Sequence, residues 1–198
     1  MTERTSYLPG TPSWIDLGSP DTAASAAFFG GLLGWTAEID PRPEAGGYGI
    51  IQDPNGSFIS VWQPNEHIGA EPVNEPGTFT WNELTTPDLA ATRAFYTAVF
   101  GWGVDPDAGA DTATVFTVGG TMVWGAHVAG EDEFPAWSIW FSVDDCDASA
   151  ARAVELGASI LMPPTDMDFG RGAVVADPHG AVIGIGVMSA TTLATAPA

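Results

Sequence analysis

The feature that most constrains this chain of 198 residues is an internal repeat. The segment WIDLGSPD at residues 14–21 corresponds to WNELTTPD at residues 81–88, and the match continues without a gap to Trp35 and Trp102. A weaker third copy covers residues 138–157. Repetition of this kind indicates one supersecondary unit that is used several times and buries its core against its neighbours. We therefore expect three similar units.

The three copies share one predicted order of elements, a strand followed by a helix and then about three strands. An alternating stretch predicts the first strand. The helix is expected to begin at Ser19 or Thr86, which can cap it, with proline at the first helical position. Gly34, Gly101 and Gly157 are expected to end the helices in the left-handed conformation.

Two Asp-Pro-x-Gly segments, at residues 53–56 and 177–180, predict tight turns between strands, and residues 118–121 take the same place in the second copy. The copies extend over residues 12–65, 78–129 and 135–190. The predicted domain organisation is a single βαβββ module at residues 1–65, a linker at 66–77, a two-module domain at 78–190 and a tail at 191–198.

Charge and composition bear on partners and compartment. The chain carries 25 acidic and 5 basic residues, a formal net charge of −20 at pH 7. Such a surface repels phosphate, so we expect neither a nucleic acid nor a membrane as partner. No apolar run approaches the roughly 18 residues of a membrane span, and residues 1–4 lack a signal-peptide core. The lone Cys146 fits a reducing cytoplasm.

Several of these motifs together resemble the vicinal oxygen chelate superfamily, which contains glyoxalases, bleomycin-resistance proteins and extradiol dioxygenases. They are the Pro-Asp helix starts, the Phe-Phe or Phe-Tyr pair in the helix, Gly-Trp after it, and the Asp-Pro-x-Gly turns. Residues 62–70 and 81–86 resemble in particular the actinobacterial tandem glyoxalase-like proteins. The resemblance implies an α+β fold in which two βαβββ modules form a cup-shaped, open barrel around a cavity.

Tandem members of the superfamily have four modules, whereas this chain has three. The resemblance therefore implies that copies two and three form a complete cup in cis. Copy one is left as half a cup, with one open face and an unpaired edge. We expect copy one to pair with copy one of a second chain across a two-fold axis, which makes the protein a homodimer.

Alternation along the first strand of each copy divides its side chains between two faces. The face under the helix is predicted to hold Ile15, Leu17, Asn82, Leu84, Ile139 and Phe141. The face that lines the cavity is predicted to hold Trp14, Asp16, Trp81, Glu83, Ser138 and Trp140.

Members of the superfamily usually hold a metal ion with a His or Gln on the first strand and a Glu on the last strand of each module. The matching positions here are Trp14, Trp81 and Ser138 on first strands, and Ser60, Trp124 and Gly184 on last strands. None is a credible ligand for a divalent ion, which prefers imidazole, carboxylate or thiolate groups. We therefore expect no metal and no other cofactor.

Aromatic side chains take the place of the metal in this prediction. The predicted ligand-binding residues are Trp81, Trp124, Trp140, Met122 and Ser138 in the cup, and Trp14 and Asp16 beside Phe58 and Trp62 in copy one. Indole rings offer flat faces to aromatic molecules and attract cations. The sequence therefore favours an aromatic or cationic small molecule as ligand; the alternative is that the tryptophans fill a small barrel as core residues.

Glu83 is the candidate catalytic residue, because a carboxylate beside indole rings in a low-dielectric cup can act as a general acid or base. The alternative is a structural carboxylate held by Arg93 or Arg171. Other reactive side chains are expected to play no part: His127 points away from the cavity, His67 lies in the linker, His179 lies in a turn and Cys146 is a buried, inert thiol.

The leading functional prediction is a metal-independent, glyoxalase-like protein that binds an aromatic or cationic small molecule, in natural-product resistance or sequestration. The second is an enzyme of secondary metabolism, an isomerase, cyclase or hydrolase, with Glu83 as acid or base. Two further alternatives are a metal-dependent oxygenase or lyase with unusual ligands, and a structural dimer module without a ligand.

Overall fold

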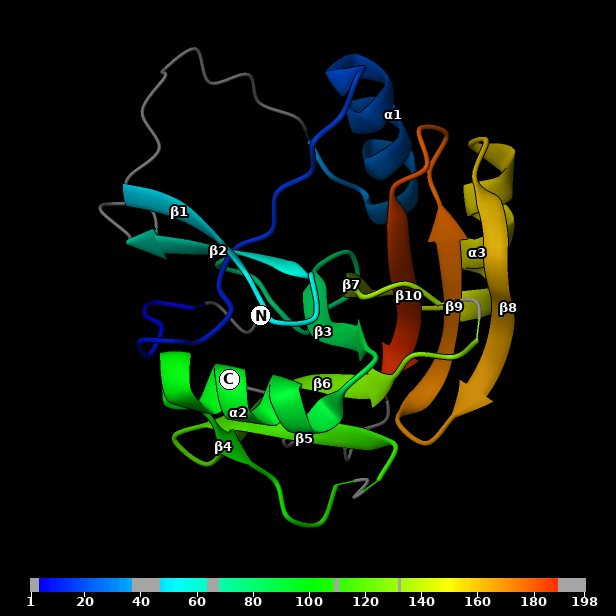
Figure 1. Cartoon of the computed structure of the whole chain (residues 1–198). Coiled ribbons are helices and arrows are strands. Elements are labelled where there is room, and N and C mark those ends of the chain that lie inside the picture. Colours follow the sequence, from blue (N-terminus) through cyan, green and yellow to red (C-terminus); the bar gives the residue numbers. More distant parts are fainter. Residues whose placement is uncertain (1–3, 37–46, 64–67, 109–110, 132, 189–198) are drawn as a thin grey trace.

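The computed structural model describes residues 4–36, 47–63, 68–108, 111–131 and 133–188. Its main element is a mixed eight-stranded sheet with the strand order β4-β5-β6-β3-β7-β10-β9-β8 (Figure 1). The strands are β3 (Phe79–Thr86), β4 (Gly103–Val104), β5 (Ala113–Val118), β6 (Thr121–Val128), β7 (Ala136–Ser142), β8 (Ser159–Met167), β9 (Gly170–Ala176) and β10 (Val182–Met188). Within the described part of the chain, no helix is long and apolar enough to cross a membrane.

Two consecutive βαβββ modules build this sheet. The first contains β3 to β6 with helix α2 (Leu89–Phe100), and the second contains β7 to β10 with helix α3 (Cys146–Glu155). In each module the first strand pairs in parallel with the last, and the antiparallel pairing of β3 with β7 joins the two modules. Copies two and three therefore have the predicted order of elements, in an α+β fold.

Copy one contributes helix α1 (Thr22–Leu33) and a separate two-stranded sheet of β1 (Gly47–Gln52) and β2 (Phe58–Gln63). Residues 12–18 form no strand, so the predicted first strand of copy one is wrong. Its counterparts β3 and β7 each lie between two neighbouring strands, whereas β1 and β2 pair only with each other among the described residues. Without a neighbouring strand, an extended segment has no ladder of hydrogen bonds to join.

Copy one is divided between the two modules. Helix α1 packs beside α3 over the second module, where Phe28 and Phe29 join a core that includes Phe141 and Ile185. The hairpin side chain Ile59 instead packs against the core of the first module. The helix and the hairpin of copy one therefore cover different cores.

The core of the first module is aromatic. Tyr96 of α2 is fully buried and stacks on Trp102 at a centroid distance of 5.3 Å. The same ring meets Trp124 of β6 edge-on at 4.9 Å, and Leu84 of β3 completes this layer. Aromatic side chains bury large areas, so this cluster accounts for much of the stability of the module.

A bulge in β6 determines which of its side chains face α2. Phe116 pairs with Trp124, but the next pair is Thr117 with Met122, so Val123 is an extra residue on β6. One extra residue reverses the alternation of side chains between the two faces. Trp124 is consequently fully buried, stacked on Phe116 at 4.2 Å. The prediction that Trp124 lines the cavity is therefore wrong.

Aspartates, rather than the predicted Ser19 and Thr86, cap the helices. Asp21, Asp88 and Asp145 each accept a hydrogen bond from the backbone N–H three residues further on. The Ser19 and Thr86 hydroxyl groups accept from the N–H groups of the capping aspartates, at 3.1 and 3.3 Å. The predicted glycine ends are confirmed, since Gly34, Gly101 and Gly157 have positive φ angles of 76°, 69° and 95°.

The turn between β1 and β2 docks on the first turn of α2. The Asn55 side-chain amide donates to Thr86 Oγ1 and Thr92 Oγ1, both at 3.0 Å. The buried Asp53 carboxylate accepts two backbone N–H groups of its own turn at Oδ1, and the Tyr96 hydroxyl at Oδ2 at 3.1 Å. Both oxygens of this carboxylate therefore have donors.

The position of Trp124 can be tested by stability. We expect Trp124→Ala to lower the free energy of unfolding by about 3–5 kcal/mol, because it removes a fully buried indole from the aromatic core. As a control, Phe134→Ala, at a side chain that is 84% exposed, should change it by less than about 0.5 kcal/mol. Urea denaturation measures both; similar effects of the two variants would contradict the assignment.

Candidate functional site

Five side chains lie on the face of the sheet opposite α2 and α3, here called the open face: Trp81, Glu83, His127, Ser138 and Trp140. The β3–β7 register sets Trp81 beside Trp140 and Glu83 beside Ser138. Next to Glu83 on the chain, Leu84 points into the core under α2. The two faces of β3 and β7 are therefore assigned as predicted.

Glu83 is at the centre of the open face. Its Oε2 accepts the indole N–H of Trp81 at 3.0 Å, and its Oε1 lies 3.1 Å from His127 Nδ1. A Cβ atom at Gly125, the partner of Glu83 on β6, would lie 2.2 Å from Oε2. Glycine is therefore required at this position for the carboxylate to lie flat across β6. The Glu83 side chain is 24% exposed, so the carboxylate remains accessible.

His127 faces the open side, in contrast to the prediction, because the bulge at Val123 shifts the alternation of β6 by one residue. Its Nε2 lies 3.3 Å from Thr85 Oγ1 and 3.7 Å from a Glu133 carboxylate oxygen. The hydrogen bond to Glu83 is the main cause that raises the pKa of His127 above its ordinary value, against the opposing effect of burial. The arrangement is a carboxylate–imidazole pair next to an indole.

Trp140 lies flat on the open face. Cβ atoms at Gly184 and Gly172 would lie 2.1 and 2.8 Å from its indole ring, so glycine is needed beneath it. Phe169 meets the ring edge-on at 5.7 Å, and Trp140 is 7% exposed. The ring thus fills the space over β9 and β10. Ser138 is half-buried beside Glu83, and Met122 is half-buried on β6.

Neither arginine expected to hold Glu83 does so. Arg93 donates to Thr114 Oγ1 and to the carbonyl of Ala113, and Arg171 forms ion pairs with Asp147 and Asp166. The predicted arginine partners of Glu83 are therefore wrong, and the carboxylate is instead bonded by Trp81 and His127. A different prediction is confirmed: Cys146 is buried, and burial raises the pKa of its thiol, which suits an inert side chain.

The copy-one residues do not join the open face. Trp14 is 54% exposed, Asp16 is exposed, and Phe58 is 63% exposed on the hairpin. Leu17, predicted under the helix, is 46% exposed, because no strand forms there to hold the alternation. His67 and the side chain of Trp62 lie outside the described residues.

The residues at the expected metal positions do not fit a metal. Trp81 and Ser138 occupy the first strands, and Trp124 and Gly184 occupy the last strands, where Trp124 is buried in the core. None of these groups is a usual ligand of a divalent ion. Among the described residues, no group of three or more His, Cys, Asp or Glu could hold one. We therefore derive no chemistry through a metal.

Sequence reasoning missed three residues of this site: Thr85, His127 and Glu133. The prediction for His127 follows from alternation along β6 relative to Trp124, and the bulge at Val123 exchanges the faces of both residues. One feature of the sequence could have indicated the different register of β6. The β5–β6 turn at Gly119-Gly120 is not an Asp-Pro-x-Gly turn, so the spacing of the other copies did not have to apply.

The pair can be tested by titration. By NMR we expect a His127 pKa above 6.5, falling in Glu83→Gln because the main stabilising hydrogen bond to the imidazolium is weakened. Glu133→Gln, the matched control, should cause a smaller fall, since its carboxylate is further away.

The raised pKa of His127 also makes the stability of the fold depend on pH. Because the pKa is raised in the folded state, the pair stabilises the fold fully below pH 6.5, and this contribution is lost as the pH rises through the folded pKa. Equal pKa values in the unchanged protein and Glu83→Gln would contradict the pairing.

Comparisons with known proteins agree with this fold. The family model described as Glyoxalase/Bleomycin resistance protein/Dioxygenase superfamily matches residues 67–185. Among solved structures, the Mn(II)-bound glyoxalase from Novosphingobium aromaticivorans has a similar fold, with a TM-score of 0.54, 19% identity, and coverage of 73% of this chain and 50% of that chain.

Curated relatives extend over nearly the whole chain. Anthracycline biosynthesis protein DauV of Streptomyces sp. (strain C5) is 31% identical over 255 residues, covering 89% of this chain and 93% of DauV. CFP32 of Mycobacterium tuberculosis is 30% identical over 257 residues, covering 93% and 97%. In the DauV alignment, 89% of 198 residues is about 176, so about 79 of the 255 positions have no counterpart here. The predicted family is thus confirmed, and the chain belongs to the Glyoxalase/Bleomycin resistance protein/Dioxygenase superfamily.

Proposed function

We propose that this protein acts in secondary metabolism and binds a flat aromatic or cationic small molecule on its open face. The name of DauV, a relative in anthracycline biosynthesis, supports the metabolic setting. Trp81 is half-buried, with its indole held beside the Glu83 carboxylate. A ring face next to a negative charge favours aromatic ligands, and cationic ones above all. We place the protein in the cytoplasm, which suits its lone, buried thiol.

The observation that carries a catalytic role is the Glu83–His127 pair. A carboxylate on Nδ1 orients the imidazole and stabilises its protonated form, so Nε2, which in this structure lies 3.3 Å from Thr85 Oγ1, is the atom that takes or returns a proton. In this proposal the proton moves at His127, and Glu83 is the positioning residue. Proton transfer of this kind serves an isomerase or a cyclase, and neither requires a metal ion.

Sequestration without turnover is the second candidate. The observation that favours it is that Trp140, 7% exposed, fills the space over β9 and β10, so this part of the open face has no deep pocket. On this alternative, Glu83 serves only as an anchor for a cationic group of the ligand.

Binding is tested by quenching of tryptophan fluorescence with an anthracycline and with quaternary aromatic cations. We expect Trp81→Ala to weaken binding roughly tenfold, the loss of about one ring-stacking interaction. Trp14→Ala, at an indole that is 54% exposed and is not among the five side chains of the open face, is the control and should leave the dissociation constant unchanged. Equal weakening by both variants would contradict binding of the ligand on the open face.

Catalysis is tested by incubating the bound ligand in deuterated water and following exchange of its acidic carbon-bound protons by mass spectrometry. His127→Gln should slow the exchange about a hundredfold, the usual size of a general-base contribution, and leave binding intact. Glu83→Gln should slow it less and shift its pH profile. Binding with no exchange in the unchanged protein would contradict catalysis and favour sequestration.

We also propose the homodimer through copy one. The hairpin exposes Ile50 and Phe58 on one face, each 63% exposed. Contiguous exposed apolar surface is typical of interaction sites. In the DauV alignment about 79 positions have no counterpart in this chain, more than one copy of the repeat. A second copy of this chain would supply an equivalent hairpin to cover that surface.

Sedimentation at micromolar concentration should show a species of twice 20.6 kDa. Phe58→Asp should shift it toward the monomer, whereas Phe134→Asp, at a more exposed ring outside copy one, should not. Raising the ionic strength should strengthen the dimer, because salt screens the repulsion between two chains of formal charge −20. A monomer under all these conditions would overturn the dimer.

A further inference from the structure

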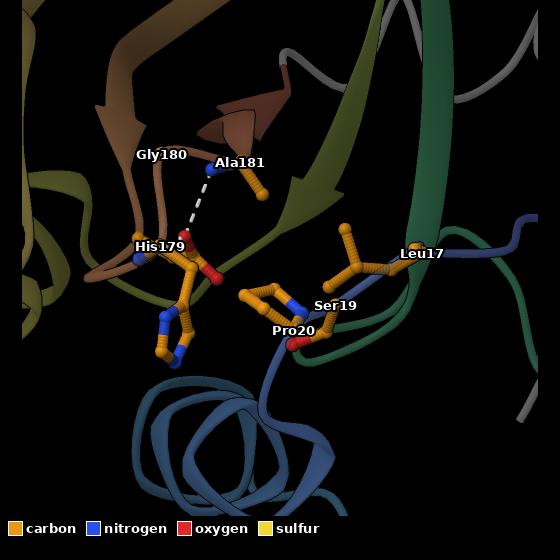
Figure 2. Close-up of a pocket in the computed structure, with 8 residues that line it drawn as sticks. Leu17, Ser19, Pro20, His179, Gly180 and Ala181 are labelled. Atoms are coloured by element: carbon orange, nitrogen blue, oxygen red, sulfur yellow. Dashed lines mark hydrogen bonds between the residues drawn. The ribbon is translucent and has the colours of Figure 1, made fainter.

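A second pocket lies away from the open face, between the β9–β10 turn and the segment that leads into α1. It has a volume of about 260 Å³ and is lined by Leu17, Gly18, Ser19, Pro20, Asp177, His179, Gly180 and Ala181. Figure 2 shows residues 179–181 on one side and residues 17–20 on the other. A water molecule occupies about 30 Å³ in the liquid, so the pocket has room for a small organic group.

This junction repeats, element for element, the one in which the β1–β2 turn docks on α2. Both turns have the sequence Asp-Pro-x-Gly, and both aspartates are buried, Asp53 at 4% and Asp177 at 5% exposure. In each turn Oδ1 accepts two backbone N–H groups, here those of His179 and Ala181 at 2.8 Å. The first junction has a hydrogen-bonded hydroxyl pair, Thr86 with Thr92 at 2.8 Å, and the second repeats it as Ser19 with Ser25 at 2.7 Å.

The two junctions differ in their hydrogen-bond donors. In the first, the Tyr96 hydroxyl donates to the second oxygen of Asp53, and the Asn55 amide donates to the hydroxyl pair and to the carbonyl of Asp88. The repeat places Phe29 where α2 has Tyr96, and His179 where the turn has Asn55. No described residue donates to Asp177 Oδ2, although that atom is buried.

The second junction is therefore rich in acceptors and poor in donors. Its acceptors are one carboxylate oxygen, the two hydroxyl oxygens of Ser19 and Ser25, and the carbonyl of Asp21, the counterpart of Asp88. A buried acceptor without a donor is destabilising, and a carboxylate is so above all. A ligand that restores these bonds must carry several N–H donors, and a positive charge matches the carboxylate.

We propose that this pocket is a binding site for a small organic cation with N–H donors, a primary ammonium group above all. The ammonium group would donate to the Ser19–Ser25 hydroxyl pair, as the Asn55 amide does to the hydroxyl pair of the first junction, and to Asp177 Oδ2, the counterpart of the oxygen that accepts the Tyr96 hydroxyl. The rest of the molecule would occupy the remaining volume, against Leu17 and Pro20. The site is independent of the one on the open face.

The test compares methylammonium with tetramethylammonium, which has the same charge but no N–H donor. Titrations of the full chain are followed by NMR of the backbone amides, at constant ionic strength. We expect methylammonium to shift the signals of residues 17–21 and 177–181 with roughly millimolar affinity, as befits a ligand of two non-hydrogen atoms. Equal shifts with both cations would show only general attraction to an acidic protein and would overturn the proposal.

Two variants make the test specific. The double substitution Phe29→Tyr with His179→Asn installs the donors of the first junction, so it should raise the Tm and weaken methylammonium binding at least tenfold. Asp177→Asn removes the charge and should abolish binding even if the double variant does not fold. Arg152→Lys, an exposed substitution on α3, is the control and should bind as the unchanged chain does. Undiminished binding by Asp177→Asn would overturn the proposal.

Discussion

The antiparallel pairing of β3 with β7 is the interaction on which both the sheet and its site depend. It joins the two modules and sets Trp81 beside Trp140 and Glu83 beside Ser138. A slip of one residue would bring the apolar partners of these side chains, such as Leu84, to the open face, so burial on the helix side holds the register. The site is thus placed by the same force that forms the core.

Much of this arrangement could be predicted from the repeat. The order of elements in copies two and three, the faces of β3 and β7 and the glycine ends of the helices follow from local patterns. The predictions that were wrong concern features set by residues far apart in the sequence. The bulge at Val123 adds one residue without a change of composition, and it exchanges the places of Trp124 and His127. The strand expected at residues 12–18 does not form, because no described strand lies beside it to pair with.

Small residues allow large ones to lie on the open face. Glu83 crosses β6 only because position 125 is glycine, and Trp140 lies flat because positions 172 and 184 are glycine. The three glycines lie on three different strands, β6, β9 and β10. The composition of the strands therefore shapes the surface as much as the polar side chains do, and a Cβ at any of the three would displace a functional group.

The division of copy one between two cores also governs how the chain comes apart. Its helix closes the second module through Phe28 and Phe29, while its hairpin rests on the first module through Ile59 and the Asn55 amide. Unfolding of either module would therefore remove packing contacts from copy one, and unfolding of copy one would expose the cores of both modules. The described chain has the connectivity of a single cooperative folding unit, in which heat would melt the N-terminal third together with the rest.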